Sequence, residues 1–461
     1  MEDTVRKENT ERRGFWNFID NIKGDKVVWI IVFMLVMISI LAVFSSTSLL
    51  ALQSKTDRLN IIRDQVITAG MGIGIIWLLC RIKTIKIFKF FSQFGFALSV
   101  LLLVLLVAEV DMGTFCKAVR INGVYRALKV FGFQVHVFEV VKVTMVMYMA
   151  WAMHTYRNDG FVIANTLSQN KNMEFLAKPF WKRMFYMYLP VAIICVLIMP
   201  GSNSSAIFIG GILIATLLIG GIPVKEIVIA GLVCVAGLLM IIGIYKMSGG
   251  ESFKRVGTFL SRIEADYSAE KLENVEERSA EFYTILDKIK QPYSAKIAVH
   301  EGGLLGKGSG NSTQKYVVAV MYGDYMFSFI IEEYGLIGAI LVIILYVSLL
   351  ARGSMIARLC ETEYAKIAVG GLSLLIVGQA FMHMLVNVDI GPMTGQTLPL
   401  ISHGSSAFLM FSAAFGTILS ISRMTRDKIR QEEEAAEPIY EKKEDEIQAS
   451  LEDIERIESI E

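Results

Sequence analysis

Long runs of apolar residues alternate with short polar segments along most of this chain. Several of the runs exceed the 18 or so apolar residues that a helix needs to cross a bilayer. We therefore predict an all-α polytopic membrane protein with about ten transmembrane helices. The predicted spans cover residues 27–45, 64–82, 91–109, 134–153, 184–200, 204–221, 226–246, 324–351, 366–386 and 405–422.

The overall composition agrees with this pattern. Of 461 residues, 54% are hydrophobic and 19% are charged, and the mean hydropathy is +0.52. The five cysteines are scattered and none has CxxC spacing. We therefore expect neither a disulfide framework nor a structural zinc site.

Basic residues indicate the topology. Lys and Arg gather before the first predicted span, between the second and third spans, and after the tenth. Because loops rich in Lys and Arg stay on the cytoplasmic side, we predict that both termini are cytoplasmic and that the loop at about 247–323 is outside.

Three regions follow from these spans. We predict a cytoplasmic N-terminal segment at 1–26, a ten-span membrane domain at 27–422, and an acidic cytoplasmic tail at 423–461. Residues 431–461 hold 13 acidic and 3 basic side chains, which gives a net charge of −10. Such a tail is usually solvated. Its apolar spacing also permits a short amphipathic helix for a cytosolic partner.

A glycine-rich, basic loop, EGGLLGKGSGNSTQK, precedes the eighth predicted span at residues 301–315. Glycine allows close backbone approach, so such a loop can aim N–H groups and lysines at an anionic oxygen. The spacing does not fit a nucleotide P-loop, so we expect the phosphate of a lipid carrier as the ligand. A flexible hinge is the alternative. The candidate substrate-binding residues are Gly306, Lys307, Gly308, Asn311, Ser312 and Lys315.

Three carboxylates lie in or beside the eighth span, where each costs roughly 2.5–3.5 kcal/mol at the bilayer centre and is a functional candidate. Asp324 is at the outer mouth of the span, within reach of water and a substrate head group. The alternative for Asp324 is a helix N-cap. Glu332 and Glu333 lie roughly 12 Å deeper, where buried hydrogen bonding between helices is favoured over direct chemistry.

The fourth predicted span carries a charge pair. Glu139 and Lys142 are three residues apart on one helix face and can neutralise each other inside the membrane. Arg126, a further candidate substrate-binding residue, lies in a polar outer turn just before this span. Structural pairing of Glu139 with Lys142 is the leading interpretation, and a place beside the substrate site is the alternative.

A second outer segment, residues 387–407, is rich in Pro, Gly, Thr and Ser. Pro392 and Pro399 cannot continue a helix, so this segment should line a cavity or close over one. His403 lies among serines, but no acidic partner follows a GxSxG elbow. A serine hydrolase is therefore not expected.

Together these motifs resemble the SEDS family (shape, elongation, division, sporulation), whose members include the FtsW and RodA branches. The extended termini favour the FtsW branch. The sequence departs from the family pattern at four positions, which affect the expected shape of the donor or acceptor site: Ala127, Val137, Phe138 and Ser405. The resemblance rests on FSSTS after the first span, NGxxR at 122–126, the Glu139 and Lys142 face, and the segments 291–315, 324–338 and 392–406.

The resemblance implies a peptidoglycan glycosyltransferase of the bacterial cytoplasmic (inner) membrane that polymerises lipid II into glycan strands during cell division or elongation. Asp324 would be the essential carboxylate, either as general base or as ligand of a divalent cation such as Mg²⁺, and both roles stay open. No other cofactor is expected. The implied partners are undecaprenyl-pyrophosphate-linked lipid II, a class B penicillin-binding protein transpeptidase, and divisome or elongasome proteins, with no nucleic acid.

Two other functions are compatible with the sequence. A transporter could flip the lipid-linked precursor along a path that uses the intramembrane charges. Transporters usually contain inverted repeats with matching broken helices, and no convincing internal repeat is found between residues 27–246 and 324–422. A non-catalytic division scaffold is the other alternative.

Overall fold

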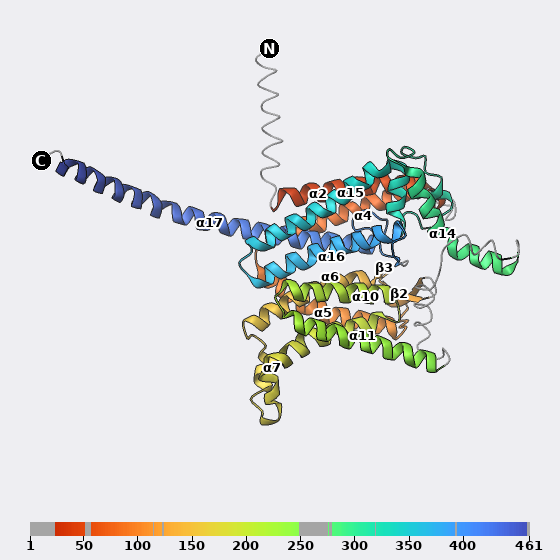
Figure 1. Cartoon of the computed structure of the whole chain (residues 1–461), viewed down its shortest axis with the longest axis horizontal. Helices are drawn as coiled ribbons and strands as arrows, with labels where there is room; N and C mark the ends of the chain where they lie inside the picture. Colours follow the sequence, from red (N-terminus) through yellow and green to blue (C-terminus); the bar gives the residue numbers. More distant parts are fainter. Residues whose placement is uncertain are drawn as a thin grey trace, which may run out of the picture.

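The computed structural model describes residues 24–50, 57–113, 115–121, 124–248, 275, 279–318, 320–391 and 394–458. Within these residues, long helices lie side by side in one bundle (Figure 1). The helices that correspond to the ten predicted spans are α2 (Lys26–Ser46), α4 (Arg58–Cys80), α5 (Ile85–Val107), α6 (Val137–Arg157), α9 (Leu189–Ile198), α10 (Asn203–Ile219), α11 (Val224–Met247), α15 (Met326–Leu359), α16 (Glu363–Asn387) and α17 (Ser405–Glu458). A short helix α8 (Pro179–Arg183) and a π-helical turn η2 (Met184–Tyr188) lead into α9.

The prediction of a polytopic helical membrane protein is confirmed. Eight described helices are long and apolar enough to cross a membrane, and α10 falls just short at 17 residues. Helix α6 is not among the eight, but most of its residues are buried inside the bundle. Helix α11 is the opposite case, because most of its described large apolar side chains are exposed. We therefore place α6 at the protein core and α11 against lipid.

Between α5 and α6 the chain forms a small antiparallel sheet, which the sequence analysis did not predict. Its strands are β1 (Cys116–Ile121), β2 (Val124–Val130) and β3 (Phe133–His136), in the order β1-β2-β3. The strands are short and mix apolar with basic residues, so they resemble an irregular loop in sequence. The sheet lies at one end of the bundle (Figure 1), which we call the sheet end.

Several predicted boundaries are wrong by a few residues. Helix α6 begins at Val137 rather than 134, because the preceding residues belong to β3. Helix α4 begins at Arg58 rather than 64, because the Asp57 side chain accepts a hydrogen bond from Leu59 N and caps it. Helix α15 begins at Met326, so Asp324 precedes the helix.

The segments between the spans add further helices. Helix α14 (Ala280–Gly302) and the turn η3 (Gln314–Tyr316) lie in the predicted outer loop. Helix α7 (Val162–Leu167) and the 3₁₀ helix η1 (Lys171–Ala177) join α6 to α8. The backbone of the predicted tail continues α17 without a break as far as Glu458 (Figure 1). Most of the predicted N-terminal segment, residues 1–23, lies outside the described residues.

A buried aspartate joins three helices at the end opposite the sheet. Asp25 is 1% exposed and caps α2 by accepting hydrogen bonds from Val27 N (3.0 Å) and Val28 N (3.2 Å). Its other carboxylate oxygen pairs with Arg352 of α15 at 2.8 Å and with Arg426 of α17 at 3.4 Å. One side chain therefore both starts the first span and ties it to two later ones.

This arrangement predicts the effect of Asp25→Asn. Asparagine caps a helix about as well as aspartate, so the substitution removes the ion pairs and keeps the cap. Because both arginines are partly exposed, we expect a loss of about 1–2 kcal/mol, less than for a fully buried pair, and a lower melting temperature in detergent. Asp57→Asn is the control, because Asp57 caps α4 and the structure describes no ion pair for it. An equal decrease in melting temperature for both variants would contradict the role of the ion pairs.

Candidate functional site

Helix α15 is broken near the sheet end, directly after its two glutamates. Gly335 has φ +67° and ψ −169°, which interrupts the helical backbone. The glycine-rich loop lies along this break and exchanges backbone hydrogen bonds with it. The four bonds are Lys307 N to Glu332 O (2.8 Å), Gly308 N to Glu333 O (2.9 Å), Leu336 N to Gly303 O (3.0 Å) and Ile337 N to Leu304 O (3.4 Å). The loop therefore replaces partners that the broken helix has lost.

The Glu332 side chain is fully buried and is surrounded by donors from the same loop. Its Oε1 accepts hydrogen bonds from Thr313 N (2.8 Å), Gln314 N (3.3 Å) and the Lys307 ammonium (2.8 Å). Its Oε2 accepts one from the Ser312 hydroxyl. These contacts compensate for the cost of burying the carboxylate.

Glu333 is buried as well and joins the loop to the first span. Its Oε1 accepts a hydrogen bond from the Ser45 hydroxyl of α2 at 2.5 Å and lies 3.5 Å from the Lys315 ammonium. Its Oε2 is buried and has no hydrogen-bond partner among the described residues. The prediction that Glu332 and Glu333 make buried hydrogen bonds therefore agrees with their geometry.

The two loop lysines have protein partners for all their donors. An ammonium group has three N–H donors. Lys307 Nζ contacts Glu301, Thr313 and Glu332, and Lys315 Nζ contacts Ser45, Gly310 and Glu333. The N–H groups of Lys307 and Gly308 and the side chains of Asn311 and Ser312 also bond within this region. The residues predicted to bind phosphate thus hold the loop against the break in α15.

Asp324 lies in the turn just before α15. The N-cap residue of α15 is Tyr325, which makes no side-chain cap bond, so the N-cap interpretation of Asp324 is wrong. Asp324 N donates to Val320 O (3.1 Å), and Asp324 O accepts from Asn387 Nδ2 (2.9 Å). Its carboxylate accepts no hydrogen bond from the described residues. Burial raises the pKa of Asp324 to about 6, and the positive charge of Arg126 opposes the shift.

Arg126 is the cation whose charge acts on Asp324. It lies on β2, and its Nε donates a hydrogen bond to Gly201 O at 3.3 Å. The sequence analysis placed Arg126 in an outer turn, and the structure places it on a strand close to the α9–α10 turn. Asn122 and Gly123, the first residues of the NGxxR motif, lie outside the described residues.

Lys142 and Glu139 form the predicted pair in α6. Lys142 Nζ lies 2.7 Å from Glu139 Oε1 and also donates to Gln379 Oε1 and Gln396 Oε1, each at 2.7 Å. Lys142 is 1% exposed, and all three of its donors are used. The sequence analysis missed Gln379 and Gln396, although the Gln379 amide lies in an apolar span, which is a signal for a buried polar network.

The same network reaches the turn that holds Asp324. His383 Nδ1 lies 2.7 Å from Gln396 O, and its Nε2 lies 3.3 Å from Phe327 N in the first turn of α15. Asn387 Oδ1 accepts a hydrogen bond from Ser328 N at 2.9 Å. His383 and Asn387, both on α16, were not predicted as site residues. They position the start of α15 and the turn before it.

The segment at 394–404, which the sequence analysis predicted to be outside, closes over this turn. Ser402 Oγ donates to Gly323 O (2.7 Å) and His403 N donates to Tyr322 O (2.9 Å). A Cβ placed on Gly395 would lie 3.6 Å from the nearer carboxylate oxygen of Asp324. His403 Nδ1 lies 2.7 Å from the Gln65 amide oxygen rather than beside a serine nucleophile. Pro392 lies outside the described residues.

The arrangement suits proton transfer from a hydroxyl group. A carboxylate without a hydrogen-bonded donor, with a pKa near neutral and a cation nearby, can accept a proton in water-poor surroundings. The described residues hold no cluster of three or more metal-ligating side chains. A single carboxylate still fits Mg²⁺, because this ion often binds through one carboxylate, substrate phosphates and water.

The sequence profile of a family described as cell cycle protein, FtsW/RodA/SpoVE, matches residues 25–427. The chain belongs to the FtsW/RodA/SpoVE family. This match covers every predicted span, the broken helix and Asp324. The resemblance to the SEDS family is therefore confirmed.

Individual relatives agree with the family assignment. The chain is 36% identical over 129 residues to the peptidoglycan glycosyltransferase MrdB of Escherichia coli, and the matched region spans 28% of this chain and 35% of that relative. It is 26% identical to a probable peptidoglycan glycosyltransferase FtsW of Enterococcus hirae, over 89% of this chain and 96% of the relative.

Solved structures share the fold. A chain of a peptidoglycan synthase complex superposes with a TM-score of 0.57 at 19% identity, covering 87% of this chain and 98% of its own length. The rod shape determining protein RodA of Thermus thermophilus gives a TM-score of 0.53 at 16% identity, and the match covers 88% of this chain and 98% of RodA. The family fold therefore extends over nearly the whole bundle.

The broken helix predicts different effects for two loop glycines. Gly306 and Gly310 both have positive φ, which costs roughly 1–2 kcal/mol for alanine. A Cβ on Gly306 would meet Glu333 O at 2.3 Å, whereas a Cβ on Gly310 meets nothing within 4 Å. We expect Gly306→Ala to abolish the yield of folded protein in detergent and Gly310→Ala to melt only slightly earlier than the wild type. Similar behaviour of the two variants would show that the loop does not pack on the break.

Proposed function

We propose that this chain is a peptidoglycan glycosyltransferase that polymerises lipid II into glycan strands. The observation that carries the proposal is the half-buried Asp324 carboxylate, which accepts no hydrogen bond from the described residues and lies in the field of Arg126. The names of the family relatives support the same activity.

The reaction would use these two residues as follows. Asp324 accepts the proton of the C4 hydroxyl on an incoming lipid II while the hydroxyl oxygen attacks the anomeric carbon of the growing chain. The bond to the lipid pyrophosphate breaks, and the leaving group takes the electron pair. Arg126 offsets the charge of that pyrophosphate. Mg²⁺, when bound at Asp324, would supply further positive charge to the pyrophosphate.

In this proposal the loop lysines act indirectly. Lys307 and Lys315 were expected to contact pyrophosphate, but their donors are occupied by Glu301, Glu332, Glu333 and their neighbours. We assign them to positioning of the α15 segment that follows Asp324. Glu139 and Lys142 act similarly, through Gln396 and the segment that covers Asp324.

We place the sheet end on the outer side of the cytoplasmic membrane, with both termini cytoplasmic. The basic segment between α4 and α5, and Arg423 and Arg426 of α17, lie at the opposite end and so favour this orientation. Asp324 is then at the outer leaflet, where a lipid-linked substrate presents its sugars. Labelling of single cysteines introduced at either end by a membrane-impermeant reagent tests the orientation.

A class B penicillin-binding protein is the proposed partner, together with other divisome or elongasome proteins. The support is the fold that this chain shares with a chain of a peptidoglycan synthase complex, which coordinates polymerisation and crosslinking. Co-purification from native membranes tests this partner. A chain that polymerises at full rate alone and binds no such protein would exclude it.

The decisive variant for the activity is Asp324→Asn. Asparagine keeps the size of the side chain and leaves the backbone bond to Asn387 in place. It cannot accept the hydroxyl proton, so we expect polymerisation of lipid II by the reconstituted protein to fall by at least about 10²-fold, with unchanged melting. The readout is the glycan product resolved on a gel, with and without the transpeptidase partner.

Asp389→Asn is the matched control for this experiment. Asp389 also lies at the sheet end, and it pairs with Lys296 at 2.6 Å rather than remaining without a donor. It has φ +63°, which asparagine tolerates. We expect this variant to polymerise at the wild-type rate. A near-normal rate for Asp324→Asn would instead favour the transporter or scaffold functions.

A further inference from the structure

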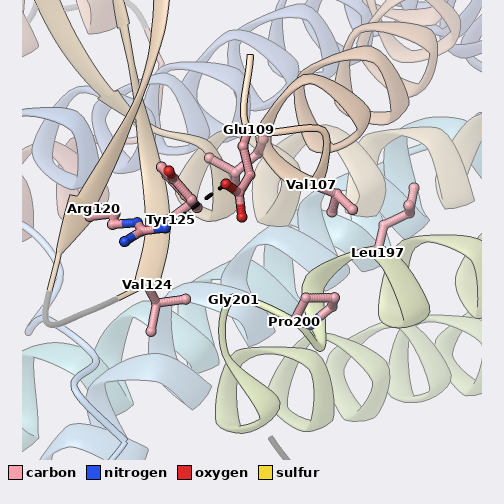
Figure 2. Close-up of a pocket in the computed structure, with 9 residues that line it drawn as sticks. Val107, Glu109, Arg120, Val124, Tyr125, Leu197, Pro200 and Gly201 are labelled. Atoms are coloured by element: carbon pink, nitrogen blue, oxygen red, sulfur yellow. Dashed lines mark ion pairs between the residues drawn. The ribbon is translucent and has the colours of Figure 1, made fainter. Parts of the chain in front are cut away.

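A cavity of about 260 Å³ lies at the sheet end, beside β1 and β2. It is bounded by the end of α5, by β1 and β2, and by the turn between α9 and α10 (Figure 2). The mechanism above uses none of its side chains. Its polar residues are Glu109, Arg120 and Tyr125.

The polar side of this cavity carries one cation in a fixed position. Arg120 and Tyr125 are cross-strand partners in the sheet, and the guanidinium lies 4.6 Å from the centre of the tyrosine ring. Glu109 lies 3.9 Å from Arg120, as the dashed line in Figure 2 shows. Both charged side chains are more than half exposed, so this long ion pair contributes little and yields easily to a stronger anion.

The other side of the cavity is apolar. Leu106 and Val107 come from the last turn of α5, and Leu197 comes from the last turn of α9. Both helices are membrane spans that end here, so these side chains lie where the hydrocarbon region meets the head groups. The cavity therefore places an apolar wall and a cation together at the membrane boundary.

The cavity also shares a wall with the candidate active site. Tyr125 and Arg126 are successive residues of β2, at the point where its register with β1 shifts. Tyr125 lines the cavity, whereas the charge of Arg126 acts on Asp324. Gly201, which also lines the cavity, accepts the hydrogen bond from Arg126 Nε. A ligand in the cavity would thus contact Tyr125 and Gly201, the direct neighbours of Arg126 in sequence and in hydrogen bonding.

We propose that this cavity binds the phosphate end of an isoprenoid lipid, with the phosphate at Arg120 and the first isoprene units against Leu106, Val107 and Leu197. The proposal rests on the proposed function, because such lipids are its substrates and products. A volume of about 260 Å³ lies below the roughly 300–1,000 Å³ of sites that enclose a whole drug-sized ligand. The cavity therefore holds a head group and the start of a chain.

The neighbouring charges predict effects of opposite sign. Arg120→Gln removes the phosphate donor and should weaken binding about tenfold. Glu109→Gln removes an anion that competes for Arg120 and should strengthen binding. A neutral sugar bound by both side chains would be weakened by both substitutions. Because a misfolded protein cannot bind more tightly, the Glu109 variant keeps the test valid if Arg120→Gln is unstable.

The probe is a polyprenyl monophosphate with a diazirine on its first isoprene unit, added to the full-length protein in phosphatidylcholine vesicles. After illumination, mass spectrometry locates the labelled peptides and the half-saturating probe concentration is measured. We expect labels at residues 106–107 and 197–201. The same diazirine on a polyprenol, which lacks the phosphate, should label these residues at least about tenfold less efficiently.

Lys117→Gln is the matched control. Lys117 also lies on β1 and is exposed to a similar extent, but it pairs with Asp111 at 2.7 Å and does not line the cavity. We expect its labelling to match the wild type. Equal loss in the Lys117 and Arg120 variants, or equal labelling by polyprenol, would overturn the proposal. Inorganic phosphate that binds at Arg120 with the affinity of the lipid would show a site for free anions instead.

Asp324→Asn separates this proposal from the proposed function. That variant should lose polymerisation yet label the cavity as the wild type does. If the wild-type enzyme polymerises lipid II but its labelling does not depend on Arg120, the lipid-phosphate cavity is refuted and the proposed activity is not. If the wild-type protein is labelled as expected but does not polymerise lipid II, the proposed activity is refuted and the lipid-phosphate cavity is not.

Discussion

The architecture at the sheet end depends on the burial of two glutamates at a break in a membrane span. Glu332 and Glu333 could not remain charged inside the bundle without compensating donors. The glycine-rich loop supplies these donors through Lys307, Lys315 and several N–H groups. Gly306 and Gly335 allow the two backbones to approach within contact distance. The loop is therefore part of the fold, and it fixes the helix that begins directly after Asp324.

A second buried charge network supports the same turn from the opposite side. Lys142 binds Gln396 in the segment that covers Asp324, while His383 and Asn387 bind the first turn of α15. Each network pairs a carboxylate with a lysine, although Glu139 Oε2 and Glu333 Oε2 accept no hydrogen bond from the described residues. Asp324 differs, because its carboxylate accepts no hydrogen bond from the described residues and the positive charge that acts on it is that of Arg126. Carboxylates that are paired with a lysine therefore differ from Asp324, which is the candidate reactive group.

Much of this arrangement could be predicted from the sequence. Hydropathy was sufficient to predict the spans. The three-residue spacing of Glu139 and Lys142 was sufficient to predict their ion pair. The sheet was missed because β1 and β2 are short and carry basic residues that suit a loop. The contacts of Lys307 could not be predicted, because composition shows that a cation is present but only the three-dimensional structure shows that its donors bond to Glu301, Thr313 and Glu332. His383 and Asn387 were not predicted as site residues, because the α15 backbone groups that they contact lie far away in sequence.

The central claim is that Arg126 beside Asp324, rather than the loop lysines, faces the phosphates of the substrate. The most direct measurement is the apparent affinity for lipid II at low and high ionic strength for Arg126→Gln and for Lys129→Gln. Both variants remove one positive charge from β2, and Lys129 is exposed. The account predicts that only Arg126→Gln weakens affinity, with the larger effect at low salt. Wild-type affinity for Arg126→Gln at both ionic strengths, or an equal loss in both variants, would contradict it.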